Sequence, residues 1–268
     1  MSHFNFEHDP VDQLYINPFV QQYVYLTLIA LAWCNAIELI ILCFNTFKRY
    51  AGSYFWNLFL ASLGIIPFGL GYFLKIYKIT FSHYFLEIII SDIGWSALVT
   101  GQSLVLWSRL HLVLHNRYIL RSLLYLIIFD GVLLHTSCTA LELATNALPK
   151  SMSVALAFGI IERIQLVWFC LQELLISGFY IYATIQLLKL DESPFSRGIL
   201  TQLIVVNIII NLLDMAVVAI QYIGFFTFQV TFKGLVYSIK LKLEYAILGR
   251  LVKVAHIRTQ MDAARFQL

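Results

Sequence analysis

The sequence predicts an all-α membrane protein, a bundle of seven transmembrane helices, and two observations carry this prediction. First, the chain of 268 residues is 60% hydrophobic and only 12% charged, with a mean hydropathy of +0.79, whereas soluble domains are about 25% charged. Second, the apolar residues gather in seven stretches, each with the roughly 20 residues that a membrane helix needs. The connections between the stretches are short, so we expect a single transmembrane domain over residues 21–251.

The order of the predicted elements follows from the apolar stretches and the segments around them. Residues 1–20 carry three acids and no Lys or Arg, and they lack the apolar core of a cleaved signal peptide, so we expect a short extracellular N-terminus. Pro67 should kink the second helix. The fifth stretch is longer than a bilayer requires, so either this helix tilts or residues 151–161 form an outer lead-in segment. The helices are expected near 21–46, 53–76, 84–111, 119–141, 154–188, 198–223 and 231–251, followed by a cytoplasmic tail over 252–268.

The distribution of Lys and Arg predicts the orientation of the bundle. Eleven of these residues lie at the side where the first, third, fifth and seventh helices end, and four lie at the other side. Cytoplasmic loops carry the excess of positive charge. We therefore expect the N-terminus outside and the C-terminus in the cytoplasm.

Ionisable residues occur inside the apolar stretches, where a charge costs about 2.5–3.5 kcal/mol at mid-membrane. Such residues usually face the interior of a bundle and mark a ligand site or a pathway. Glu87, Glu162, Arg163 and Lys242 can reach a membrane face by extending along the helix. The pattern leaves Glu38 and Asp130 open, and the other five are expected inside. The eleven residues are Glu38, Glu87, Asp92, Asp130, Glu162, Arg163, Glu173, Asp214, Lys240, Lys242 and Glu244.

The buried polar residues recur at helical spacing, so each set lies on one face of its helix. On the sixth predicted helix, Asn207, Asn211 and Asp214 occupy positions i, i+4 and i+7. The ordinary interpretation of the amides is a set of interhelical hydrogen bonds, worth about 0.6–2 kcal/mol each, whereas full charges point to a functional site. The predicted ligand-binding site or polar core is Asp92, Glu173, Asp214, Lys240 and Glu244, supported by Asn207, Asn211, Tyr237 and Gln172.

Arg109 and His111 are expected at the cytoplasmic face, at the end of the third helix. Many seven-helix receptors hold an arginine of a conformational lock here, but no acid precedes Arg109, so we interpret it as an arginine that meets lipid phosphate. His111 and His115 have the i, i+4 spacing of metal ligands, but no third ligand is evident. No metal site and no catalytic residue are therefore predicted, and we expect that the protein is not an enzyme.

Three segments carry a resemblance to a known family: 103–113 (SLVLWSRLHLV), 162–182 (ERIQLVWFCLQELLISGFYIY) and 237–248 (YSIKLKLEYAIL). Together with 207–222 (NIIINLLDMAVVAIQY), they resemble a family of fungal seven-helix membrane proteins catalogued as a domain of unknown function. More loosely, they are similar to the fungal receptor-like proteins of the Pth type. The resemblance implies a fungal source and a receptor-like architecture, and it implies no particular activity.

The favoured function is a receptor-like or sensory role. We expect an unknown small or lipidic ligand in the outer half of the bundle, a cytoplasmic signalling partner, no nucleic acid, and the plasma membrane rather than an internal membrane. The alternative is a transporter or an ion- or proton-conducting protein, because polar helix faces can line a path.

A retinal-binding photoreceptor is less favoured. Lys240 has the depth of a Schiff-base lysine, and Asp92 or Asp214 can serve as its counter-ion. However, the sixth helix has no Trp to enclose a polyene, and Lys240 and Glu244 have the i, i+4 spacing of a local ion pair. We therefore expect no cofactor.

Overall fold

The structure is a computed structural model that describes residues 18–46, 52–77, 84–114, 116–148, 151–190, 194–223 and 226–265. Within these ranges every regular element is an α-helix, which confirms the predicted all-α class. The helices are α1 (Pro18–Thr46), α2 (Ser53–Tyr77), α3 (Tyr84–Val113), α4 (Arg117–Ala147), α5 (Met152–Leu190), α6 (Pro194–Ile223) and α7 (Phe226–Arg265).

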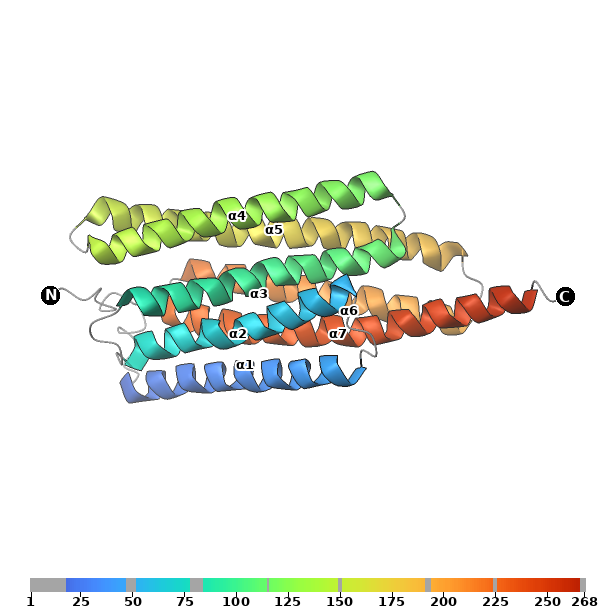
Figure 1. The fold of residues 1–268 in the computed structure, drawn as a ribbon, viewed down its shortest axis with the longest axis horizontal. Coiled ribbons are helices and arrows are strands. Elements are labelled where there is room, and N and C mark those ends of the chain that lie inside the picture. Colours follow the sequence, from blue (N-terminus) through green and yellow to red (C-terminus); the bar gives the residue numbers. More distant parts are fainter. Residues whose placement is uncertain are drawn as a thin grey trace.

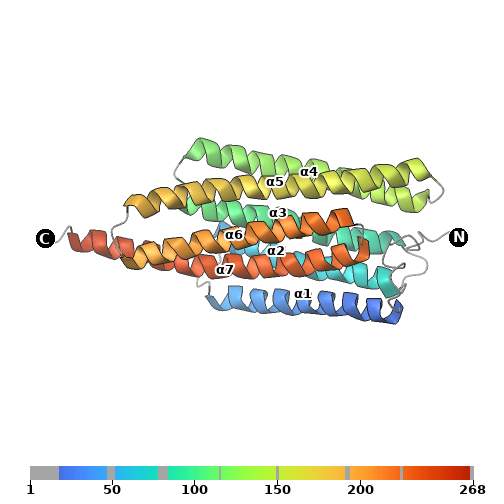
Figure 2. The same cartoon turned by 180° about the vertical axis from the view of Figure 1, so that it is seen from behind.

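The seven helices lie side by side in one elongated bundle, and each runs antiparallel to the next (Figures 1 and 2). α1, α3, α5 and α7 therefore end at one end of the bundle, which we call the basic end because most of the Lys and Arg counted above lie near it. We call the opposite end, where α2, α4 and α6 finish, the pocket end, because a pocket opens near it. α7 runs the length of the bundle and extends past its neighbours at the basic end (Figure 1).

Six helices, α1 to α6, are long and apolar enough to cross a membrane. α7 is not among them, and its described side chains include Lys233, Lys240, Lys242 and Glu244. Nevertheless α7 packs against α1, α2, α3 and α6 inside the same bundle. The length and apolar character of the six helices identify a helical integral membrane protein whose environment is the lipid bilayer.

Several helices are longer than the apolar stretches from which they were predicted. α4 continues past residue 141 to Ala147, and α7 continues past residue 251 to Arg265. Apolar character marks the part of a helix at membrane depth, whereas polar helix formers extend it further. α5 is one continuous helix that includes most of the segment 151–161, and α2 continues through Pro67.

The closest helix pair is α2 with α3, and glycines make this approach possible. A Cβ atom on Gly64 would lie 2.9 Å from the carbonyl oxygen of Gly94, and one on Gly94 would overlap the backbone of Phe68. Small residues let helix backbones approach closely in membranes, where packing rather than the hydrophobic effect holds helices together.

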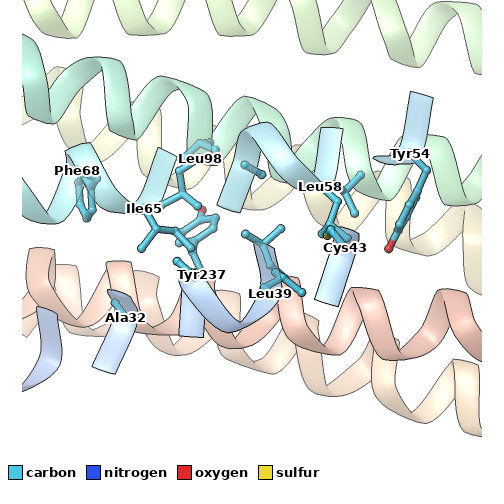
Figure 3. Packing of buried hydrophobic residues seen from close by; sticks show 14 of the residues in the cluster. Ala32, Leu39, Cys43, Tyr54, Leu58, Ile65, Phe68, Leu98 and Tyr237 are labelled. Carbon is cyan, nitrogen blue, oxygen red and sulfur yellow. The ribbon is translucent and has the colours of Figure 1, made fainter. Parts of the chain in front are cut away.

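The apolar core falls into two main clusters. The first joins α1, α2, α3, α5 and α7 and includes Leu39, Leu58, Ile65 and Leu98 (Figure 3). The second joins α3, α4, α5, α6 and α7 and includes Leu110, Leu123, Ile176, Leu203 and Ile247. Ionic side chains contact both clusters, because Tyr237 belongs to the first and lies against Lys240, and Tyr180 belongs to the second and lies against Arg109.

Candidate ligand pocket and ionic core

Lys240 forms the centre of a buried ion triad that joins three helices. Its Nζ lies 2.5 Å from Oε2 of Glu173 on α5, and it also pairs with Oδ1 of Asp214 on α6. The ammonium group lies 4.4 Å from the centre of the Tyr237 ring, one turn earlier on α7. The side chain of Lys240 is completely enclosed. Three of the predicted core residues therefore meet, and the burial of Lys240 is offset by two carboxylates and an aromatic face.

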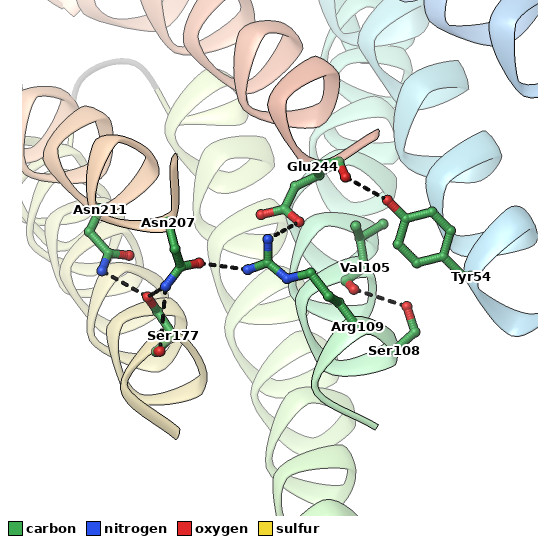
Figure 4. A network of polar contacts seen from close by, with 8 residues as sticks. All are labelled: Tyr54, Val105, Ser108, Arg109, Ser177, Asn207, Asn211 and Glu244. Atoms are coloured by element: carbon green, nitrogen blue, oxygen red, sulfur yellow. Dashed lines mark hydrogen bonds and ion pairs between the residues drawn. The ribbon is translucent and has the colours of Figure 1, made fainter. Parts of the chain in front are cut away.

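Arg109 and Glu244 form a second buried ion pair. Nη1 of Arg109 lies 2.8 Å from Oε2 of Glu244, and both side chains are fully buried. Nη2 of Arg109 donates a hydrogen bond of 2.6 Å to Oδ1 of Asn207 (Figure 4). The guanidinium group also lies over the ring of Tyr180, at 4.1 Å from the ring centre. A planar guanidinium can form these contacts together, because it combines a fork of donors with a flat face.

The interpretation of Arg109 as a lipid-facing residue is wrong. α3 continues to Val113, so Arg109 lies more than one turn before the helix end and points into the bundle. Its acid comes from α7 rather than from the adjacent position on α3. The sequence signal that was available is Glu244, because a buried acid on another helix needs a basic partner. His111, by contrast, is exposed at the basic end, with its ring 6.2 Å from that of Trp107.

A short set of hydrogen bonds extends the ion pair to α5 and α6. Nδ2 of Asn207 donates to Oγ of Ser177 at 2.5 Å, and Nδ2 of Asn211 donates to the same oxygen at 2.8 Å (Figure 4). The hydroxyl of Tyr54 on α2 donates to the backbone oxygen of Glu244 at 3.1 Å. Ser177 was not predicted, although it follows Glu173 by one helical turn on the same face.

We call the set Arg109, Glu173, Asp214, Lys240 and Glu244 the ionic core. Glu244 pairs with Arg109 and not with Lys240, so the predicted local i, i+4 pair is wrong. The core contains three carboxylates and two basic groups, and it ties α3, α5, α6 and α7 together. Gln172, predicted to support it, is buried with no hydrogen-bond partner among the described residues.

Asp92 does not belong to this core, which corrects the prediction that five charges converge. It precedes Arg109 by 17 residues on the same helix, a separation of about 25 Å at the 1.5 Å rise of an α-helix. Helical spacing predicts the face on which a residue lies, and it does not make residues at different depths meet. Asp92 instead lines a separate pocket near the other end of the bundle.

This pocket opens between α2, α3, α4, α5 and α7, at the pocket end of the bundle. The space between its walls is about 470 Å³, a figure that includes the open mouth. Charged, aromatic and apolar side chains share its wall. The lining residues are Phe68, Tyr72, Ser91, Asp92, Trp95, Cys138, Glu142, Phe158, Glu162, Gln165, Leu166, Val230 and Lys233.

Two lysines neutralise two of the three acids in the pocket wall. Nζ of Lys233 lies 3.4 Å from Oε1 of Glu162, and Nζ of Lys75 lies 3.5 Å from Oε1 of Glu142. Asp92 is different, because it has a hydrogen bond with Thr139 but no ion pair with a described lysine or arginine, and its Oδ2 is enclosed without a hydrogen-bond partner among the described residues. Lys75, Glu142 and Lys233 were not predicted as site residues, since they lie near the ends of the apolar stretches and read as interfacial charges.

A hydrogen-bonded chain leads from the pocket wall into the bundle. Nε2 of Gln165 lies 3.0 Å from Nδ1 of His135, and Nε2 of His135 lies 3.2 Å from Oγ1 of Thr100. The His135 ring also stacks on Phe169 at 5.2 Å. Both ring nitrogens of a single histidine are therefore held in place, which gives His135 a satisfied position inside the bundle.

Other charges of the predicted set are paired outside these two sites. Lys242 binds Glu38 at 2.5 Å and the side-chain oxygen of Asn35 at 2.7 Å, which joins α7 to α1. Asp130 accepts a hydrogen bond of 2.7 Å from Nε1 of Trp168, which joins α4 to α5. In the described part of the chain, no three His, Cys, Asp or Glu side chains lie close enough to hold a metal ion.

The fold and these sites define a class: a helical integral membrane protein with an ionic core and a charged pocket. The chain belongs to the family described as a domain of unknown function, DUF7703, whose sequence model matches residues 16–264. This match confirms the predicted membership in a family of that description. No curated protein and no solved structure matches the chain.

Proposed function

We propose that the protein is a receptor-like membrane sensor in which all seven helices cross the bilayer. One observation supports this proposal above the others: three helices, α3, α5 and α7, contribute residues both to the pocket wall and to the ionic core. Each of these helices carries one charged residue of the pocket wall and one of the core, in that order: Asp92 and Arg109 on α3, Glu162 and Glu173 on α5, and Lys233 and Lys240 on α7. A ligand that shifts any of these helices at the pocket also acts on the core.

The ionic core has the energetics of an element with discrete states. Removal of one partner from a buried ion pair costs about 3–5 kcal/mol, because the remaining charge stays buried and uncompensated. The core therefore favours rearrangement from one paired state to another over gradual loosening. In the proposed mechanism, occupancy of the pocket favours one arrangement of α3, α5, α6 and α7 by the difference in ligand affinity between the two states.

The proposal places the pocket end outside the cell and the basic end in the cytoplasm. Without the buried Arg109, ten Lys and Arg residues remain on the basic side against four on the pocket side, so the positive-inside rule still favours this orientation. A cytoplasmic signalling partner would then meet the basic end. The proposal retains the expected fungal source, the loose similarity to Pth-type proteins and the plasma membrane, and it includes neither an enzymatic activity nor retinal.

The experiment that tests the proposal measures coupling between the core and the pocket. Cys138 lines the pocket, so its rate of modification by methyl methanethiosulfonate, followed by mass spectrometry in nanodiscs, reports on the pocket. A triple variant, Glu173→Gln, Asp214→Asn and Lys240→Met, removes the ion triad without leaving a bare charge. Because allosteric coupling is typically 5–150-fold, we expect the rate to change by about fivefold or more.

The matched control neutralises an ion pair that lies outside the core. The double variant Glu38→Gln and Lys242→Met removes the pair between α1 and α7, and we expect it to leave the rate at Cys138 unchanged. Equal rates in the wild type and in the triple variant would contradict the receptor-like proposal.

A second candidate function is a transporter or an ion- or proton-conducting protein. The observation that favours it is the chain of Gln165, His135 and Thr100, which leads inward from the pocket. Reconstituted proteoliposomes with a pH-sensitive dye inside distinguish the candidates. The receptor-like proposal expects no proton flux above that of protein-free vesicles, and a flux lost in His135→Ala would support conduction instead.

A further inference from the structure

We infer that the pocket binds a small, singly charged organic cation, a short protonated alkylamine, with its ammonium group at Asp92. The inference rests on the proposed function, because it names the ligand class for the same pocket. Three observations carry it: the balance of charge in the wall, the surroundings of Asp92, and the aromatic and apolar side chains that complete the pocket.

Among the described residues, the balance of charge in the pocket wall leaves one carboxylate without a cation. Asp92, Glu142 and Glu162 line the pocket, and the ammonium groups of Lys75 and Lys233 lie beside Glu142 and Glu162 respectively. Three acids against two bases leave one excess negative charge when all five groups are ionised. A monovalent cation matches this excess, whereas an anion would meet three carboxylates.

Asp92 is the residue at which the missing cation belongs. Its carboxyl group has a hydrogen bond with Thr139 but no ion pair with a described lysine or arginine, its Oδ2 is enclosed without a partner in the described part of the chain, and Glu142 lies close enough to repel it electrostatically. A desolvated carboxylate without a cation is costly, and a second carboxylate nearby adds to that cost. An ammonium group seated at Asp92 would pair with its carboxylate from the pocket side and offset the repulsion.

The rest of the wall suits an alkylammonium better than a bare metal cation. The pocket already accommodates two ammonium groups on aromatic faces, since Lys233 lies 5.1 Å from the ring centre of Trp95 and Lys75 lies 5.8 Å from that of Tyr72. Such faces attract organic cations through the ring quadrupole. The alkyl part of the ligand would lie against the apolar side chains Phe68, Phe158, Leu166 and Val230.

A titration with ethylammonium chloride tests the inference on the full chain in nanodiscs. We expect a saturable rise in the thermal unfolding midpoint with ethylammonium and no such rise with sodium chloride at equal ionic strength, because a ligand that binds the native state stabilises it. Asp92→Asn should abolish the rise. Asp130→Asn is the matched control, because Asp130 is a buried acid bonded to Trp168, outside the pocket wall, and it should retain the rise.

A measurement on the wild type keeps the inference testable even if Asp92→Asn does not fold. Ethylammonium should slow the modification of Cys138 by methyl methanethiosulfonate, about tenfold at ten times the dissociation constant. Sodium chloride should leave the rate unchanged. Equal slowing by both salts, or no slowing by ethylammonium, overturns the inference. The second result would mean that a proton shared by Asp92 and Glu142 neutralises the excess charge.

The failure of this inference and the failure of the proposed function give different results. If ethylammonium protects Cys138 but the triple variant of the ionic core leaves the pocket unchanged, the cation site stands and the receptor-like mechanism falls. If the triple variant alters the pocket but ethylammonium has no effect, the coupling stands and the ligand class is wrong.

Discussion

Arg109 and Lys240 are two cations enclosed in the interior of a membrane bundle, and each is held by contacts from several helices. Arg109 meets an acid on α7, an amide on α6 and a ring on α5, while Lys240 meets acids on α5 and α6. In both arrangements the acid partners come from other helices. Consequently the effect of each substitution depends on what happens to the partners that remain.

The ion triad should respond differently to the loss of one member and to the loss of all three. Lys240→Met leaves Glu173 and Asp214 as adjacent buried acids, so we expect a destabilisation of about 3–5 kcal/mol. The triple variant Glu173→Gln, Asp214→Asn, Lys240→Met should recover most of that stability, because it leaves no uncompensated charge. Reversible unfolding in mixed micelles measures both. A triple variant as unstable as Lys240→Met would contradict this account.

Arg109 should not be replaceable by lysine. Arg109→Lys keeps the charge but loses the fork that reaches both Glu244 and Asn207 and the flat face on Tyr180. We expect a loss of about 1.5–3 kcal/mol, the range for hydrogen bonds to charged groups. Arg163→Lys is the control, because Arg163 is exposed on α5 and should tolerate the change. Thermal unfolding midpoints of the two variants, compared with that of the wild type, test this expectation. Equal midpoints for Arg109→Lys and Arg163→Lys would contradict it.

At this scale the sequence predicted which residues are buried and polar, but not how they pair. Periodicity placed Asp214 with Asn207 and Asn211 on one face of a helix, and this much can be calculated from spacing alone. The partner of Glu244 depends instead on how deeply α3 and α7 lie relative to each other, which involves packing between segments that are distant in the chain. Asp92 was misplaced for the same reason.

Among the elements, α2 and α3 form the pair whose backbones are closest, and this closeness positions the pocket wall. α2 supplies Phe68 and Tyr72, and α3 supplies Asp92 and Trp95. Of the glycines at the contact, Gly94 directly precedes Trp95, and Gly64 lies about one helical turn before Phe68. Separation of the two helices should therefore change both the stability of the bundle and the shape of the pocket.

The same substitution at two glycines should have opposite effects. Gly94→Ala places a methyl group into the backbone of α2 at Phe68, so we expect a destabilisation of about 1–3 kcal/mol from overpacking. A Cβ on Gly178 of α5 meets nothing within 4 Å, so Gly178→Ala should stabilise by up to about 1 kcal/mol through helix propensity. Unfolding midpoints of the two variants test this, and equal shifts would contradict the close approach.

Helix positions were largely predictable from the sequence, and helix ends were not. The seven apolar stretches match seven helices because burial in lipid requires both apolar side chains and internally satisfied backbone groups. Glu142 was missed because the apolar stretch ends before it, although α4 continues. The additional turns hold polar residues, and those turns include part of the pocket wall.

The whole molecule is asymmetric along its length, with acids and a pocket near one end and most of the basic residues near the other. This asymmetry agrees with the proposed orientation. Both polar sites also contain one more acid than base. The molecule therefore has two places where a cation or a proton would be favoured, at different depths of one bundle.

Labelling of two engineered cysteines tests the orientation. The two substitutions are Tyr118→Cys, at the basic end of α4, and Leu148→Cys, directly after its pocket end. The native side chains at these positions are 84% and 57% exposed. With the exposed Cys34 replaced by Ser, a membrane-impermeant maleimide added to intact cells should label position 148 and not position 118. Labelling of position 118 alone would show that the orientation is the opposite of the proposed one.

The charges of α7 have a consequence for biogenesis. α7 is the helix least able to enter lipid alone, and it is synthesised after the acids of α1, α5 and α6 that pair with its lysines. The cost of a charged segment falls when partners are already in the membrane. In the proposed seven-span topology, insertion of α7 and closure of the ionic core are then one event. A nascent chain in which the ionic core does not close exposes bare carboxylates at membrane depth. Such exposed charges are the kind of defect by which cellular quality control recognises an unfinished membrane protein.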